Sequence, residues 1–102
     1  MSDTLEISTE KWFLTQCKKR AYTAIKLGFI VGLPDRLVFA PQARLCFVEF
    51  KKKKGGRFAK AQIIWAARFE NLGFKCYKCT DRKEAQLILD SLETGATDTW
   101  KE

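Results

Sequence analysis

Histidine is absent from this sequence, and no apolar run reaches the ~18 residues that a membrane-spanning helix needs. The first ten residues are polar and acidic, so they lack the basic and apolar regions of a secretory signal. Repeats, low-complexity tracts and linkers are missing as well. We therefore expect one intracellular domain over residues 1–102, with its core at about 8–93 and a flexible tail at 94–102.

The lack of histidine also bears on the four cysteines, two of which form a Cys76-x-x-Cys79 pair. A structural zinc site needs four ligands, and no histidine or second closely spaced cysteine pair is present to complete one. Cys76 and Cys79 also fall three positions apart in an expected strand, where they would face opposite sides. We therefore expect free thiols, the usual state inside cells.

Positive charge dominates, because 19 Lys and Arg residues against 12 Asp and Glu residues leave a net charge of +7. The excess lies in two clusters, residues 18–20 and residues 51–54, and Arg57 and Lys60 extend the second. A basic surplus on a small domain is typical of a protein that binds a polyanion, nucleic acid above all. A merely solvated lysine-rich face is the alternative.

Apolar spacing and turn residues predict the order helix, strands, helix, strand, helix. The expected bounds are a helix from about Glu10 capped by Ser8 or Thr9, a short strand and loop in 22–31, a hairpin of strands 36–40 and 44–51, a helix at 58–72 ended by Gly73, a strand at 74–79, and a last helix capped by Thr80 or Asp81. The expected buried positions on the helices are Trp12, Phe13, Cys17, Ala21, Ile63, Ala66, Ala67, Phe69, Ala85, Ile88, Leu89 and Leu92. This order indicates an α/β fold with a mixed central β-sheet flanked by helices.

The strand sequence Val48-Glu49-Phe50-Lys51 places Glu49 and Lys51 on one face, while Val48 and Phe50 point into the other layer. A glutamate in so apolar a strand needs a partner if it is buried. Asp35 opens the preceding strand, so hairpin pairing brings Asp35 beside Glu49. Two converging carboxylates repel each other unless a cation lies between them, and Mg²⁺ commonly uses one or two carboxylates with water and phosphate. The Phe50 carbonyl is a plausible third ligand.

A metal held there would acidify a bound water and offset charge on a phosphodiester undergoing hydrolysis. Lys51 can orient that water or contact the scissile phosphate, and the basic run after it can hold the flanking backbone. These residues predict a metal-dependent nuclease. The alternative is a surface hairpin with an exposed Glu–Lys pair, which is common and contributes little.

The ordered motifs Gly32-Leu33-Pro34-Asp35-Arg36, Phe47-Val48-Glu49-Phe50-Lys51 and the helix residue Gln62 resemble the VRR-NUC family of the PD-(D/E)xK nuclease superfamily. The match spans roughly residues 10–92. The resemblance implies a restriction-endonuclease-like core and a Mg²⁺- or Mn²⁺-dependent endonuclease.

The resemblance also implies a role for each matched residue. Asp35 and Glu49 are the expected metal ligands, Lys51 is the expected catalytic lysine, and Gln62 supports the site unless it faces solvent. An extra helix carboxylate is expected at Glu10, or else at Glu6. Glu10 has an alternative explanation as a helix N-terminal residue favoured by the dipole. The expected DNA-binding residues are Lys52, Lys53, Lys54, Arg57, Lys60 and Arg36.

Family members that consist of this domain alone resemble virus-type homodimeric resolvases of four-way (Holliday) junctions. A bacterial or phage-infected cytoplasm is the location that this resemblance implies. Trp12, Phe13, Trp65 and Phe69 are candidate residues of a dimer interface, with core packing as the alternative for each. Three other hypotheses stay open at this point: a nuclease for flaps or nicked DNA, a non-catalytic DNA-binding module, and a structural protein with an exposed lysine loop.

Overall fold

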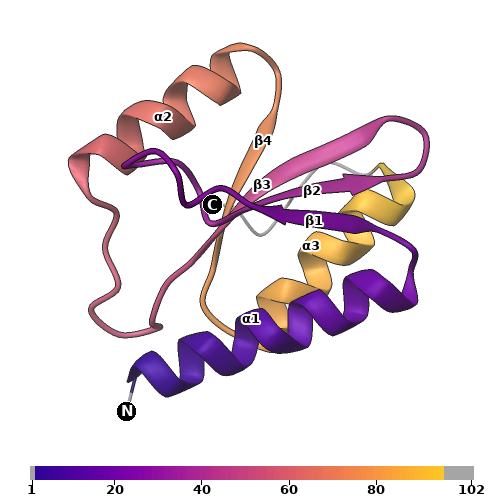
Figure 1. Cartoon of the computed structure of the whole chain (residues 1–102), viewed down its shortest axis with the longest axis horizontal. Helices are drawn as coiled ribbons and strands as arrows, with labels where there is room; N and C mark the ends of the chain where they lie inside the picture. The colour runs from indigo at the N-terminus through magenta and orange to yellow at the C-terminus, as the bar shows by residue number, and fades with distance from the viewer. Residues whose placement is uncertain (1, 96–102) are drawn as a thin grey trace.

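The computed structural model describes the backbone of residues 2–95 and the side chains of residues 8–95. Within that range the elements follow the expected order (Figure 1). Their bounds are α1 (Ser2–Lys19), β1 (Thr23–Lys26), β2 (Arg36–Ala40), β3 (Arg44–Phe50), α2 (Lys60–Asn71), β4 (Lys75–Cys79) and α3 (Arg82–Thr94). No helix in the described part of the chain is long and apolar enough to cross a membrane.

The strands form one mixed sheet in the order β1-β2-β3-β4. β1 pairs with β2 and β2 with β3 in antiparallel fashion, whereas β4 lies parallel to β3. Parallel neighbours need a crossover connection, and α2 with its flanking loops provides it. The predicted hairpin is confirmed, with Arg36 opposite Val48, so the start of β2 lies beside the end of β3.

The main core lies between one face of the sheet and the helices α1 and α3, which run along that face (Figure 1). The side chains of Val48 and Phe50 point into this layer, where the Phe50 ring meets that of Phe13 edge to face at 5.5 Å. The predicted burial of four residues of α3 is confirmed for Ala85, Ile88, Leu89 and Leu92. Asp81 caps α3, since its Oδ1 accepts a hydrogen bond from the Glu84 N–H.

Among the described residues, α2 is the one helix on the opposite face of the sheet. Phe69 of α2 stacks on Phe47 of β3 with ring centroids 4.1 Å apart, and Trp65 stacks on Phe69. No residue of α2 is fully buried. The expected burial of Ile63 and Ala67 was therefore wrong, and Ile63 leaves 55% of its surface exposed. This helix covers the β3–β4 side of the sheet and leaves apolar surface open on both of its flanks.

Three expectations about helix ends were wrong. α1 begins at Ser2 rather than near Glu10, so Ser8 and Thr9 lie inside the helix and cap nothing. Caps and propensities are weak signals for where a helix begins, because tertiary packing overrides them. α2 begins at Lys60, which leaves Phe58 in the preceding loop. Ala21 was expected on the buried face of the first helix, but it lies beyond α1 and is exposed. The flexible tail was expected at residues 94–102. Its residues 96–102 lie outside the described part of the chain.

Candidate active site

Two loops and two strand ends bring the candidate residues to one place. Asp35 precedes β2 in the turn after β1, and Glu49 is the penultimate residue of β3. The antiparallel register between β2 and β3 places these positions side by side. Gly32 adopts φ +93°, and an added Cβ would lie 2.7 Å from the Cβ of Ala61. This turn therefore packs closely on α2, which helps to hold Asp35 in position.

Hydrogen bonds interlock Asp35 with β3. The backbone N–H of Asp35 donates to Oε1 of Glu49 at 3.1 Å, and Oδ2 of Asp35 accepts from the backbone N–H of Phe50 at 2.8 Å. The expectation that Asp35 and Glu49 meet at the sheet edge is therefore confirmed as geometry.

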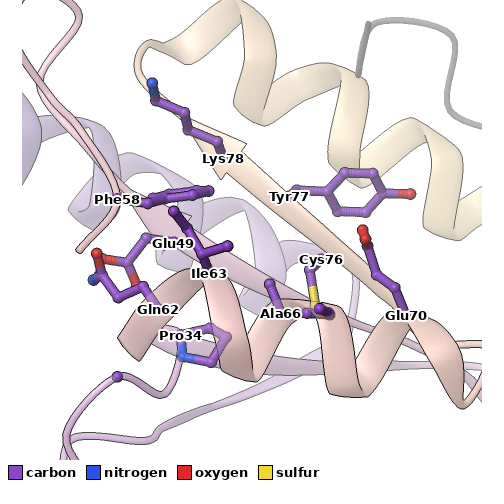
Figure 2. A pocket seen from close by; sticks show the side chains of 12 residues that line it. Pro34, Glu49, Phe58, Gln62, Ile63, Ala66, Glu70, Cys76, Tyr77 and Lys78 are labelled. Atoms are coloured by element: carbon purple, nitrogen blue, oxygen red, sulfur yellow. The ribbon is translucent and has the colours of Figure 1, made fainter. Parts of the chain in front are cut away.

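Lys51 and Gln62 converge on the other oxygen of Glu49. The Gln62 amide nitrogen donates to Glu49 Oε2 at 2.7 Å, and the Lys51 ammonium lies 3.4 Å from the same oxygen. Gln62 also accepts a hydrogen bond from the N–H of Ala59 at 2.7 Å, so its amide plane is held at both ends. Figure 2 shows Gln62 beside Glu49 at one end of a groove. Gln62 therefore does not face solvent.

The electrostatics of the site reflect this crowding. Glu49 is 8% exposed, and burial, followed by the charge of Asp35, raises the pKa of its carboxyl to about 7. Lys51 opposes that shift. Burial also raises the pKa of Asp35, while the Phe50 N–H opposes the rise and the charge of Glu10 adds to it. Two carboxylates with raised pKa values and one nearby ammonium form a site that an additional cation would stabilise.

The donor set fits a hard divalent cation. Asp35 and Glu49 offer carboxylate oxygens, and the Phe50 carbonyl lies in the chain between Glu49 and Lys51. Across the described residues no three His, Cys, Asp or Glu side chains gather closely enough to hold a metal by themselves. Mg²⁺ commonly uses only one or two carboxylates and completes its shell with water and substrate phosphate. Asp35 and Glu49 are therefore the residues that would hold such an ion.

Glu10 does not join this pair. Its Oε2 lies 2.8 Å from Nε of Arg36 in an ion pair that links α1 to β2. The same contact engages Arg36, which was expected to bind DNA. Glu6 lies in α1, but its side chain is outside the described residues. The role of Glu10 as a further metal ligand stays a prediction.

The basic loop, residues 51–59, joins β3 to α2 and carries most of the candidate DNA-binding residues. Lys54, Arg57 and the following Lys60 are exposed, whereas Lys53 pairs with Asp81 at 2.6 Å. An added Cβ at Gly56 would lie 2.2 Å from the carbonyl oxygen of Lys52, so the loop folds tightly on itself.

Sequence reasoning missed two residues at this loop. Lys78 pairs in register with Glu49, and its ammonium donates to the Gly56 carbonyl at 3.0 Å. Phe58 lies close to two cations, with the ammonium groups of Lys51 and Lys78 at 5.9 and 5.7 Å from its ring centre. Only the parallel β3–β4 register reveals Lys78, and sequence periodicity carries no signal for that register.

No disulfide joins any of the four cysteines. Cys79 is buried in the core, and Cys76 pairs with Phe47 on the opposite face. Burial raises the pKa of the Cys79 thiol to about 12, so this thiol stays protonated. The two cysteines of the pair therefore share no ligand site.

Comparisons with known proteins agree with this geometry at the level of the fold. The chain is similar to a solved structure described as a "VRR_NUC domain", with a TM-score of 0.73 and 21% sequence identity over 83% of this chain and 94% of the other. No protein-family model and no curated protein matches the sequence. The expected α/β fold, a mixed sheet flanked by helices with the VRR_NUC architecture, is confirmed.

Proposed function

We propose that this protein is a metal-dependent endonuclease that hydrolyses phosphodiester bonds in DNA. The observation that carries the proposal is the convergence of Asp35, Glu49 and Lys51 at one sheet edge, with Gln62 bracing Glu49. A fold like that of a VRR_NUC domain supports it. A purely structural role does not account for a buried carboxylate beside a half-buried one, both with raised pKa values, because their repulsion costs stability.

The roles of the residues follow from their contacts. Asp35 and Glu49 would hold a Mg²⁺ or Mn²⁺ ion, which supplies a water acidic enough to attack phosphorus and offsets charge on the phosphate oxygens. Lys51 lies 3.4 Å from Glu49 Oε2, so its ammonium is placed to contact the scissile phosphate or orient the attacking water. Gln62 holds Glu49 in one orientation through its bond to Oε2.

The basic loop supplies substrate affinity. The exposed side chains of Lys54 and Arg57, with Lys60 at the start of α2, lie on the chain segment that connects Lys51 to Gln62. Each phosphate contact releases counterions, so binding through these residues weakens as salt rises. Lys52 is half-buried, and Lys53 must first leave Asp81 to take part.

Cleavage assays test the proposal directly. A labelled four-way junction and a linear duplex of the same sequence are incubated with Mg²⁺, Mn²⁺ or EDTA. Cutting should require metal and should fall by at least about a hundredfold in Asp35→Asn, Glu49→Gln and Lys51→Met. Lys83→Met, which removes an exposed lysine on α3, is the matched control and should cut normally. Binding without metal-dependent cutting would replace the proposal with a non-catalytic DNA-binding module.

We further propose that the preferred substrate is a four-way junction and that the active form is a homodimer. A two-fold dimer presents two active sites that are related by symmetry. The two cleavable strands of a junction are related by a similar symmetry. Cutting of flaps or nicked duplex instead of junctions would support the nuclease activity and contradict the preference for junctions.

An exposed apolar surface gives the dimer a place to form. Ile25 of β1 and Phe39 of β2 lie on the sheet face that α2 leaves open, and both are about 40% exposed. Beside α2, the turn that carries Phe29, Ile30 and Val31 leaves Val31 87% exposed. Gly32 packs this turn against Ala61 and Trp65. We define these five exposed residues as the outer apolar surface, and covering it with a second copy would remove it from water.

Two of the four interface candidates belong to α2, on the same side of the sheet as this surface. Trp65 and Phe69 are half-buried on the α2 side. Phe13 is wholly buried in the core, so it is not available for an interface, and half-buried Trp12 packs against that core on the other face of the sheet. Sedimentation should find a dimer that dissociates in the double variant Ile25→Glu, Phe39→Glu. Leu87→Glu, on α3 across the sheet, should leave it intact.

A further inference from the structure

A groove of about 400 Å³ lies between α2 and β4 and opens directly beside the candidate active site. Figure 2 shows Glu49 and Gln62 at one end, with Phe58 and Ile63 close by and Cys76 further along. The groove falls within the roughly 300–1,000 Å³ of ordinary small-molecule sites. None of the five residues that define the outer apolar surface lines this groove.

Much of the lining of this groove is apolar, although Glu70 and Tyr77 lie at the end away from Glu49 (Figure 2). Pro34, Ile63, Ala66 and Ala67 contribute carbon surface to it. Ile63 is more than half exposed, although it is a large apolar residue beside a catalytic carboxylate. Charge and metal binding do not account for such a lining, whereas an apolar occupant would.

The mouth of the groove is cationic. Lys51 and Lys78 place their ammonium groups on the Phe58 ring, and Lys78 also lines the groove. Contact with two cations and the bond from Lys78 to Gly56 hold this ring in place. An occupant whose phosphate lies at the mouth and whose flat apolar part enters the groove would satisfy both regions. A nucleotide has both parts, a charged phosphate and a flat base.

We propose that this groove is a subsite for one unstacked nucleobase of the DNA strand, next to the scissile phosphate. The proposal rests on the proposed nuclease function and deepens it. A base inside a duplex cannot enter, whereas a base at a branch point is already weakly stacked and leaves the helix at low cost. The subsite therefore selects for branched or distorted DNA by requiring a base to leave its stack.

A set of abasic junctions tests the proposal. Each four-way junction lacks one base at a different nucleotide around the branch, and its affinity is measured in EDTA, where no cutting occurs. Contact of a base with an aromatic side chain typically strengthens binding by about tenfold. We expect a loss of that size at one or two positions and almost none elsewhere. Equal affinity for all the junctions would overturn the subsite.

Variants of the groove assign the loss to it. Ala66→Phe fills the groove, so it should weaken binding of the intact junction about tenfold and erase the penalty for the abasic one. Ile63→Ala removes an exposed side chain without opening the core, so it should reduce the same penalty. This variant keeps the test decisive if Ala66→Phe folds poorly. Leu87→Phe, an exposed apolar position on α3, is the control and should keep the full penalty.

The outcomes separate the subsite from the nuclease. Metal-dependent cutting without any base-dependent affinity would remove the subsite and leave the nuclease. Base-dependent affinity that the groove variants erase, without cutting under any metal, would support the subsite and remove the nuclease. If the groove variants dissociate a dimer and leave the abasic penalty unchanged, a second copy covers the groove and the subsite is overturned.

Discussion

The backbone N–H of Asp35 donates a hydrogen bond to Oε1 of Glu49, while the Asp35 carboxylate accepts one from the N–H of Phe50. This reciprocal pair joins the turn before β2 to the end of β3. It brings two acidic groups together and satisfies one oxygen of each with a backbone donor. Gln62 and Lys51 engage the other oxygen of Glu49. Each carboxylate oxygen has two lone pairs, so the site keeps capacity to accept a cation.

The Glu49 carboxyl makes the stability of the metal-free protein depend on pH. Its pKa rises from 4.5 to about 7 on folding, so the folded state binds the proton more tightly than the unfolded state. The Glu49 carboxyl therefore does not destabilise the folded state below about pH 4.5. Its destabilising effect grows through neutral pH and levels off above about pH 7. A shift of that size corresponds to roughly 3 kcal/mol at most.

Glu49→Gln should therefore be more stable than the native protein at pH 8 in EDTA, by about 1–3 kcal/mol. The gain should shrink toward zero at pH 5. Urea unfolding of both proteins at several pH values measures the difference. Glu93→Gln, an exposed position that pairs with Arg20, should show no such gain. A Glu49→Gln gain that is constant with pH would contradict the assigned cause.

Gln62 should act through Glu49 rather than on the substrate. Gln62→Ala removes the bond to Glu49 Oε2, so that carboxylate is held less firmly. Groups that orient metal ligands typically change metal affinity by about 10–100-fold. The Mg²⁺ concentration for half-maximal cutting should rise accordingly, while DNA affinity in EDTA stays unchanged. Gln86→Ala, a glutamine paired with Asp90 on α3, is the matched control. An unaltered Mg²⁺ requirement in Gln62→Ala would show that the contact does not orient a ligand.

The fold and the centre of the site were largely readable from the sequence because local patterns encode them. Strand alternation placed Glu49 and Lys51 on one face, and the Pro41 turn set the hairpin that brings Asp35 beside them. Apolar spacing identified the buried face of α3. Each of these signals depends on neighbours within about twenty residues along the chain.

Features that depend on distant pairing were missed. The parallel register of β3 and β4 places Lys78 beside Glu49, and their sequence separation carries no pattern for it. The partial burial of α2 was missed for a related reason, because its apolar residues fit a buried helix equally well. The ion pair between Glu10 and Arg36 joins α1 to β2, and neither segment alone indicates it.

Asp81 has two partners that substitutions can separate. Its Oδ1 caps α3 through the Glu84 N–H, and its Oδ2 holds Lys53 at 2.6 Å. Asp81→Asn keeps the cap, because asparagine caps helices about as well, and releases Lys53. We expect stability within about 1 kcal/mol of the native value, tighter DNA binding, and a salt dependence that is steeper by about one counterion.

Two further variants check this assignment. Asp81→Ala loses the cap as well and should lower the free energy of unfolding by about 1 kcal/mol. Lys53→Met in the native background should change DNA affinity little, since Asp81 already engages the ammonium. A large loss of affinity in Lys53→Met alone would mean that Lys53 leaves Asp81 whenever DNA binds.

Arg44 should stabilise the fold without touching the chemistry. Its guanidinium donates to the carbonyl oxygen of Leu92 at 3.2 Å and to that of Glu93, so a cation covers the C-terminal end of α3. The last carbonyls of a helix lack internal partners, and a positive charge there also favours the helix dipole. Arg44→Met should lower the free energy of unfolding by about 1–2 kcal/mol.

The position of Arg44 makes this test independent of the active site. It begins β3 and Glu49 lies five residues further on, so the two are roughly 16 Å apart along the strand. Cutting per folded molecule should therefore be native in Arg44→Met, and Arg44→Lys should recover part of the stability through its charge. Urea unfolding and cleavage at a temperature well below the transition measure the two properties separately. A loss of cutting that exceeds the loss of folded protein would show that the end of α3 is coupled to the Asp35–Glu49 pair.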